Sequence, residues 1–123
     1  MGRLTYMPIP NYDRSTALDE IKSGIPDRIG LAILALASFD PDWRWTQNLC
    51  LDFYSSCNDN IRGTAILGLG YIARFQGKLD AEAAVPIVIQ ALSDPSDFVR
   101  GNADDALADI LMFCIAEDYD RTK

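Results

Sequence analysis

The sequence predicts an all-α fold, an α-solenoid of about three stacked antiparallel helix pairs. One observation is apolar spacing: in residues 59–72 the apolar side chains fall on one helix face, at Ile61, Ala65, Gly68, Leu69 and Ile72. The other is recurrence of this stretch, with Gly30 lying 33 positions before Gly63 and Arg100 lying 38 positions after Arg62. Periods of this size are typical of helix-pair repeats, in which each unit buries its apolar face against the next.

The first unit follows an extended segment. Residues 1–14 contain Pro8 and Pro10 and are predicted to be a lead-in without helix. Residues 15–38 are predicted to be the first helix pair, with Ser15 as the N-cap of its first helix. The second helix is a nearly uncharged run of Gly, Ala, Ile and Leu, so we expect it to be packed on most of its circumference.

The second and third pairs are predicted over residues 42–75 and 80–116. Gln76-Gly77 is expected to end the second pair, and Ser96 to cap the last helix. Pro86 lies within the apolar pattern of the third pair, where it either occupies the first turn of a helix or kinks it. Residues 117–123 form a polar, acidic tail, and the whole of 1–123 is predicted to be one domain.

Three glycines in one predicted helix require a compensating reason, because each weakens a helix by roughly 1 kcal/mol relative to alanine. They are Gly63, Gly68 and Gly70, and Gly63 recurs as Gly30 and Gly101 in the other units. We expect them to mark close contacts between helices.

The charge is acidic and unevenly distributed. The chain of 123 residues has 49% hydrophobic and 24% charged residues and a net charge of −7, with a net charge of −1 over residues 1–76 and −6 over 77–123. Like charges repel a phosphate backbone, so the sequence argues against a nucleic-acid ligand and favours a cationic partner.

The sequence does not show the residue combinations expected of a catalytic or metal site. The chain has no histidine, and its three cysteines, Cys50, Cys57 and Cys114, show no CxxC spacing, so nucleophilic pairs and zinc sites are not predicted. Asp105 and Asp109 share a helix face and could in principle hold magnesium, but no second set of ligands accompanies them. We therefore predict no enzyme activity, no metal and no cofactor.

The compartment is predicted from the same composition. No apolar run reaches eighteen residues, and the N-terminus has no signal-peptide core, so neither a membrane span nor secretion is indicated. We expect a cytoplasmic protein with reduced thiols. The oligomeric state is left open.

The repeat pattern resembles the HEAT repeat. In that family the second helix begins with an Asp, a Val-Arg pair and Ala, followed by Ala-Leu-Gly and an aliphatic residue. The second unit matches from Asp59 and Arg62 to Ile72, and the third from Asp97 and Arg100 to Ile110. The first unit matches only from Gly30 and has Ile29 where the arginine is expected. The resemblance implies structural roles for Arg62 and Arg100, each bound to an aspartate of a nearby turn, with Asp59, Asp97 and their neighbours as candidates.

The resemblance also implies which surface remains for a partner, because second helices line the concave side of such an array. The positions that face away from the core there are expected to be Leu31, Leu34, Thr64, Leu67, Tyr71, Asn102, Asp105 and Asp109, with Asp104 adding to the acidity of the third unit. Tyr71 and Leu67 are the candidate anchors of a binding site surrounded by carboxylates. The apolar members could instead be covered by the lead-in or by curvature.

Among small free-standing bacterial proteins, this chain resembles the HEAT-like immunity proteins. The resemblance implies a protein that neutralises a cognate toxin, here a basic nuclease domain, by occluding it. The alternative is an intracellular adaptor or regulatory scaffold for a partner enzyme. The neighbouring gene distinguishes the two hypotheses, since an immunity gene directly follows its toxin gene.

Overall fold

The structure, a computed structural model, describes residues 9–115. In this part of the chain the elements are helices and no strand is present, which confirms the all-α prediction. The helices are α1 Arg14–Lys22, α2 Pro26–Phe39, α3 Trp43–Phe53, α4 Asp59–Tyr71, α5 Ala81–Ala91 and α6 Asp97–Ile110. Helices α4 and α6 each continue into one π-helical turn, Ile72–Gln76 and Leu111–Ile115 respectively. The predicted lead-in up to residue 8 and the acidic tail lie outside the described residues.

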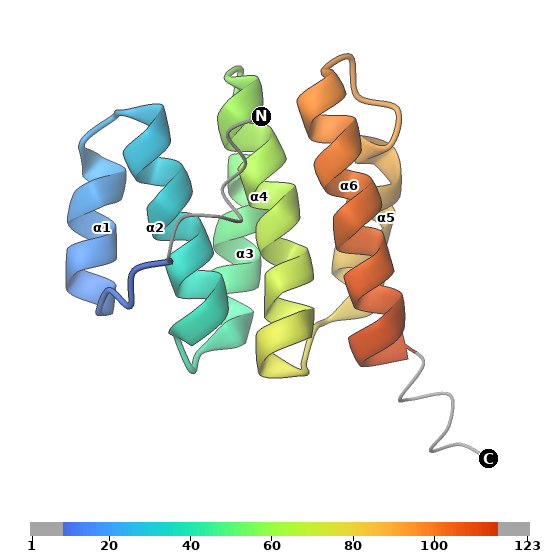
Figure 1. Cartoon of the computed structure of the whole chain (residues 1–123), viewed down its shortest axis with the longest axis horizontal. Helices are drawn as coiled ribbons and strands as arrows, with labels where there is room; N and C mark the ends of the chain where they lie inside the picture. The colour runs from blue at the N-terminus through green and yellow to red at the C-terminus, as the bar shows by residue number, and fades with distance from the viewer. Residues whose placement is uncertain (1–8, 116–123) are drawn as a thin grey trace.

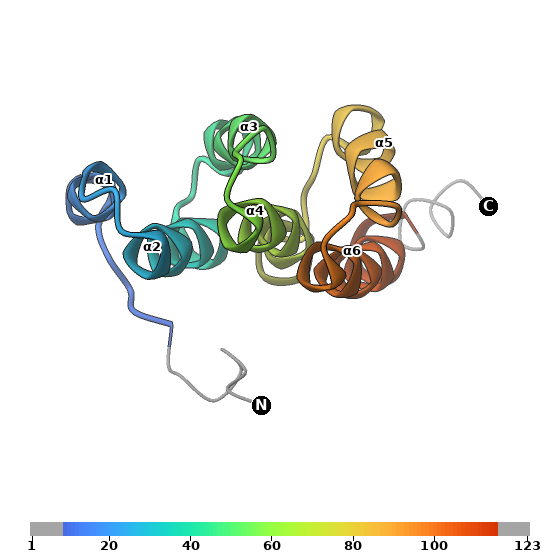
Figure 2. The same cartoon turned by 90° about the horizontal axis from the view of Figure 1, so that it is seen from above.

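The helices form two layers in a row of pairs (Figure 1). Viewed from above, α1, α3 and α5 form one layer and α2, α4 and α6 the other (Figure 2). Helix α4 lies in the middle and packs against both α2 and α6. The pairs are therefore stacked side by side, as in a helical repeat.

Short-range capping sets where the helices begin. The side chains of Asp42, Asn58 and Ser96 accept hydrogen bonds from the backbone N–H groups of Trp45, Ile61 and Val99, which confirms Ser96 as a cap. The prediction of Ser15 as the first cap is wrong. Asp13 occupies that position, and its Oδ1 accepts from the Thr16 N–H at 2.8 Å. A carboxylate is a stronger acceptor for these N–H groups than a hydroxyl is.

A glycine ends the helix of the second pair, whereas a proline lies inside a helix of the third. Gly77 ends the second pair as expected, with a left-handed φ of 67° that glycine adopts without steric cost. Pro86 is the sixth residue of α5, so the first-turn alternative is wrong. Because proline has no N–H, the carbonyl of Glu82 loses its helical donor at this position. The side chain of Pro86 is exposed.

The core runs between the two layers and is centred on α4. Its largest fully buried apolar side chains include Ile33, Ile66, Leu69, Ile72 and Ile110, while Leu36 belongs to a smaller cluster with Ala17 and Ala32. Each buried side chain of this size stabilises the fold by roughly 1.5–3 kcal/mol.

Two of the predicted close contacts involve glycines of α4. A Cβ at Gly70 would lie 2.7 Å from the Cα of Ala106, and one at Gly68 would lie 2.9 Å from the Sγ of Cys50. The three-glycine helix is therefore explained by its position between two neighbours. Gly63 belongs to the same set, since a Cβ there would lie 2.5 Å from the ring of Phe98.

Candidate protein-interaction surface

The candidate surface is the second-helix face, which we define as the side of α2, α4 and α6 that points away from α1, α3 and α5 (Figure 2). Leu67 and Tyr71 are partly buried there, Asp105 is exposed and Asp109 is partly buried. These four predicted residues come from α4 and α6, which pack against each other. They form the centre of the candidate site.

Two predicted surface residues are instead buried. Thr64 is only 4% exposed, and its side chain lies 3.5 Å from the Cβ position of Gly30, inside the contact between α2 and α4. Leu34 is fully buried, whereas Leu31 is partly buried. The expectation that Thr64 and Leu34 face outward is wrong, because the tight approach of α2 to α4 covers Thr64 and the fold leaves Leu34 no exposed area.

Asn102 lies at the edge of this surface. Its side chain is partly buried near Gly63, with Nδ2 3.0 Å from the Cβ position of that glycine. Among the described residues, Nδ2 is a buried atom without a hydrogen-bond partner. Such a group costs about 1–3 kcal/mol. Asn102 therefore belongs to the contact between α4 and α6 rather than to the open surface.

An aromatic group extends the site beyond Tyr71. The rings of Tyr71 and Phe75 pack edge to face with their centroids 5.5 Å apart. The guanidinium of Arg74 lies 5.5 Å from the ring centroid of Phe75, which is 53% exposed. Tyr71, Arg74 and Phe75 share one side of α4 and its π-helical turn, because residues three and four apart are neighbours on a helix. The sequence analysis missed Arg74 and Phe75, although this spacing from Tyr71 was a usable signal.

Carboxylates of α6 lie beside this aromatic group. Burial raises the pKa of Tyr71, and the charges of Asp109 and Asp105 raise it further against the opposing charge of Arg74. Burial also raises the pKa of Asp109, again with Arg74 opposing and Asp105 adding to the effect. We call Leu67, Tyr71, Arg74, Phe75, Asp105 and Asp109 the recognition patch. It combines a partly buried tyrosine and an exposed phenylalanine with one basic and two acidic side chains.

Asp104 is exposed but belongs to a different side of α6. Successive helical residues are rotated by about 100°, so Asp104 points away from the side that carries Asp105 and Asp109. By the repeat spacing of 38, Asp104 corresponds to Ile66, which is fully buried between α4 and its neighbours. The three aspartates that the sequence groups together are therefore divided between two surfaces.

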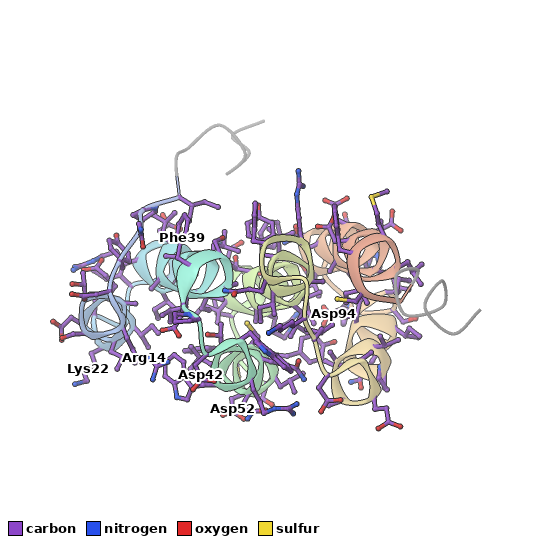
Figure 3. All side chains as sticks on the ribbon, turned by 90° about the horizontal axis from the view of Figure 1, so that it is seen from below. Arg14, Lys22, Phe39, Asp42, Asp52 and Asp94 are labelled. Carbon is purple, nitrogen blue, oxygen red and sulfur yellow. The ribbon has the colours of Figure 1, made fainter. Side chains whose placement is uncertain are left out.

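The second-unit arginine forms a buried ion pair across the repeat boundary. Nη2 and Nε of Arg62 donate to the two carboxylate oxygens of Asp94 at 2.8 and 3.1 Å, and the Asp94 side chain is 5% exposed. Asp94 lies in the interior in Figure 3, whereas Lys22 and Asp52 lie on the outer side of α1 and α3. The hydrogen bonds from Arg62 lower the pKa of Asp94 to about 2, supported by the Ser96 N–H and the Tyr54 hydroxyl. This pair joins the second unit to the loop of the third.

The predicted aspartate partners are only partly correct. Arg62 forms its salt bridge with Asp94 rather than with Asp59, whose Oδ2 instead accepts from the Ser96 hydroxyl at 2.7 Å. Arg100 does pair with Asp97, and its Nη1 also donates to the Asp94 carbonyl at 2.7 Å. Arg62 reaches 32 positions along the chain because the loop before α6 packs against the start of α4.

Other candidate chemistry is absent from the part of the chain that the structure describes. Residues 9–115 hold no group of three or more metal-ligating side chains placed to bind an ion. None of the helices there is both long and apolar enough to cross a membrane. Cys50 is fully buried, and burial raises the pKa of its thiol to about 12, so it stays protonated at neutral pH.

Comparison with known proteins gives one informative match. No family model matches the chain, and no curated protein matches its sequence. In fold, it is similar to a chain in the crystal structure of a CDI complex from Cupriavidus taiwanensis LMG 19424, with a TM-score of 0.79 and 26% sequence identity. The similarity covers 90% of this chain and 96% of that one. The match therefore extends over nearly the whole of both chains and is not confined to one helix pair.

Proposed function

We propose that this protein is an immunity protein of a contact-dependent growth inhibition system, a cytoplasmic HEAT-like protein that binds a cognate toxin domain and blocks it. The observation that carries the proposal is the fold similarity to a chain of a CDI complex over nearly the whole length of both chains. The carboxylates of α6 beside the aromatic rings of Tyr71 and Phe75 support the binding of a protein at this surface.

The chemistry of the partner follows from the charge of the third unit. Helix α6 contains Asp97, Asp104, Asp105 and Asp109 but only one basic residue, Arg100. Complementary fields accelerate association and exclude partners of like charge. The proposed toxin domain is therefore basic, as expected for a nuclease whose active site binds phosphates.

The recognition patch supplies the contact that follows this electrostatic encounter. Tyr71 and Phe75 are aromatic, adjacent and incompletely buried, which are properties of residues that dominate binding energy in protein interfaces. Asp105 and Asp109 surround them with negative charge. In the proposed complex the aromatic group anchors the toxin while the carboxylates pair with its basic residues, so substrate is excluded from its active site.

Growth rescue tests the function directly. The domain encoded by the gene that directly precedes this one, which the proposal identifies as the toxin, is expressed from an inducible promoter, with or without this protein. We expect growth arrest with the toxin alone, recovery with both, and a stable complex in size-exclusion chromatography. Continued arrest and separate elution of the two purified proteins would show that the proposal is wrong and would favour the adaptor hypothesis.

Neutralising three carboxylates of α6 tests the role of charge. We expect replacement of Asp104, Asp105 and Asp109 by Asn to lower the association rate constant about tenfold or more at low salt, and less at high salt. Stopped-flow binding to the same toxin domain measures this. The matched control replaces Asp19, Asp27 and Asp52, which are exposed on the first two pairs, by Asn. Equal rates for the two triple variants would contradict steering by the third unit.

A further inference from the structure

Helices α4 and α6 occupy the same place in consecutive units, so their surfaces can be compared position by position. By helical spacing, one side of α4 and its π-helical turn carries Arg62, Gly63, Ile66, Gly70 and Ala73. Of these, Gly63 and Gly70 lie against residues of α6, and Arg62 binds Asp94 in the loop before α6. Apart from Arg62, whose side chain is 17% exposed, all of these positions are buried. They show what a second helix of this fold uses to receive the next unit.

Among the described residues, no further unit packs against the equivalent five positions of α6 and its π-helical turn. At the repeat spacing of 38 they are Arg100, Gly101, Asp104, Ala108 and Leu111, which we call the end face. Four of the five are exposed, and the Arg100 side chain is 41% exposed. Helix α6 is the last of its row, and none of the described helices lies beyond it (Figure 1).

Gly101 has no role in the described packing of this chain. A Cβ at Gly63 would lie 2.5 Å from the Phe98 ring, which would have to shift, whereas a Cβ at Gly101 would meet nothing within 4 Å. Glycine inside a helix weakens it relative to alanine. A glycine that lowers the stability of the helix and faces open space has an explanation if another molecule approaches the helix backbone at that position.

Asp104 indicates the chemistry of that molecule. In the second unit the equivalent residue is Ile66, which is fully buried and lies on the same side of α4 as Gly63 and Gly70. A terminal repeat needs some polarity on its outer face, and one carboxylate supplies it. The rest of this region stays apolar, since Leu111 is 48% and the adjoining Met112 68% exposed. The face therefore keeps the character of a stacking surface and places the carboxylate of Asp104 at its centre, while the charge of Arg100 is paired with that of Asp97.

We propose that a basic helix of the toxin domain packs against the end face as the neighbour that α6 lacks, with a Lys or Arg opposite Asp104 and a large side chain over Gly101. This inference rests on the proposed function and adds a second contact region to the recognition patch. A second copy of this chain is a poorer occupant. Each copy carries a net charge of −7, and head-to-tail stacking of repeats would form open chains.

Two substitutions test the end face without threatening the fold. Gly101→Leu fills the open space with a good helix former, and Asp104→Lys reverses the central charge on an exposed position. The matched controls are Asn48→Leu and Asp52→Lys, which introduce the same side chains on the exposed side of α3. Thermal unfolding verifies that all four variants are folded.

Binding to the toxin domain encoded immediately upstream is measured by isothermal titration calorimetry. We expect each end-face variant to bind about tenfold or more weakly, equivalent to about 1.4 kcal/mol, and each control to bind like the wild type. Wild-type affinity for both end-face variants would overturn this inference and leave the proposed function intact. No binding by the wild type would instead overturn the proposed function. If Gly101→Leu changed only self-association in sedimentation experiments, the occupant would be a second copy and the inference would be wrong.

Discussion

The junction between the first and second helix pairs is built from different chemistry from the junction between the second and third. At the later junction Arg62 and Asp94 form a buried, bidentate ion pair. At the earlier junction the equivalent positions hold Ile29 and Ser56, so both members of the pair are replaced together. Ile29 is 6% exposed and belongs to the apolar core. The same place in the repeat thus accepts either an apolar contact or a complete ion pair.

The close contacts also differ between the two junctions. At the earlier junction, Gly30 faces the Thr64 side chain at an ordinary contact distance of 3.5 Å. At the later one, Gly70 lies directly against the backbone of Ala106, where no side-chain rotation could make room for a Cβ. The later junction therefore carries the buried charges and the one contact with backbone, whereas the tight contact of Gly68 at the earlier junction is with side chains, those of Cys50 and Ile33.

The largest expected effect comes from breaking the ion pair on one side. Asp94→Ala leaves Arg62 without its buried carboxylate, and we expect the free energy of unfolding to fall by about 3–5 kcal/mol. Urea denaturation followed by circular dichroism measures this. The control is Asp97→Ala, which removes the exposed partner of Arg100 and should cost no more than about 1 kcal/mol. Similar losses for the two variants would show that the buried pair has no special role at the later junction.

Lowering the pH is expected to reduce the free energy of unfolding by a smaller amount, and this change reports on the same ion pair. Hydrogen bonding to Arg62 lowers the pKa of Asp94 from 3.8 to about 2, so the folded chain releases this proton more readily than the unfolded chain. The resulting stabilisation is complete above about pH 4 and is lost as the pH falls through about 2, for a total on the order of 2 kcal/mol.

The comparison variant is Asp94→Asn, in which the side chain at position 94 has no ionisable group. The difference in unfolding free energy between the wild type and Asp94→Asn should shrink between pH 5 and pH 2. Contributions from the other carboxylates largely cancel in this difference. A constant difference over that range would mean that the ion pair is not the acid-sensitive contact.

The smallest of these effects concerns the glycines at the two junctions. Gly70→Ala should lower the free energy of unfolding by about 1–2 kcal/mol, because the overlap with Ala106 outweighs the gain in helix propensity. Gly30→Ala should be neutral or stabilising by up to about 1 kcal/mol, since its Cβ has room. Equal effects in thermal unfolding would remove the distinction in packing.

Local signals in the sequence were sufficient for the helices themselves. Ser96 caps α6 and Gly77 ends the turn after α4, because these interactions join groups within about four residues of each other. The repeat spacing likewise identified the three helix pairs and the glycine that recurs in the second helix of each pair. Where a local prediction was wrong, as with Ser15, a competing acceptor stood two residues earlier, at Asp13.

The candidate site was only partly accessible from the sequence. Tyr71, Asp105 and Asp109 come together as expected, whereas Thr64 and Leu34 are buried. A helix exposes different residues according to its rotation against each neighbour, and α4 has neighbours on two sides. Periodicity gives the apolar face of a helix but not the area that a second neighbour covers.

The all-α repeat of stacked pairs, the acidic third unit and the lack of histidine can all be read from the sequence. The pairing of Arg62 with Asp94 instead of Asp59, and the separation of Asp104 from Asp105, follow from how the units pack. The difference is one of range along the chain. Helix formation and capping depend on neighbours within one or two turns, whereas partners 32 residues apart meet only when the angle between successive units is set by packing of the core.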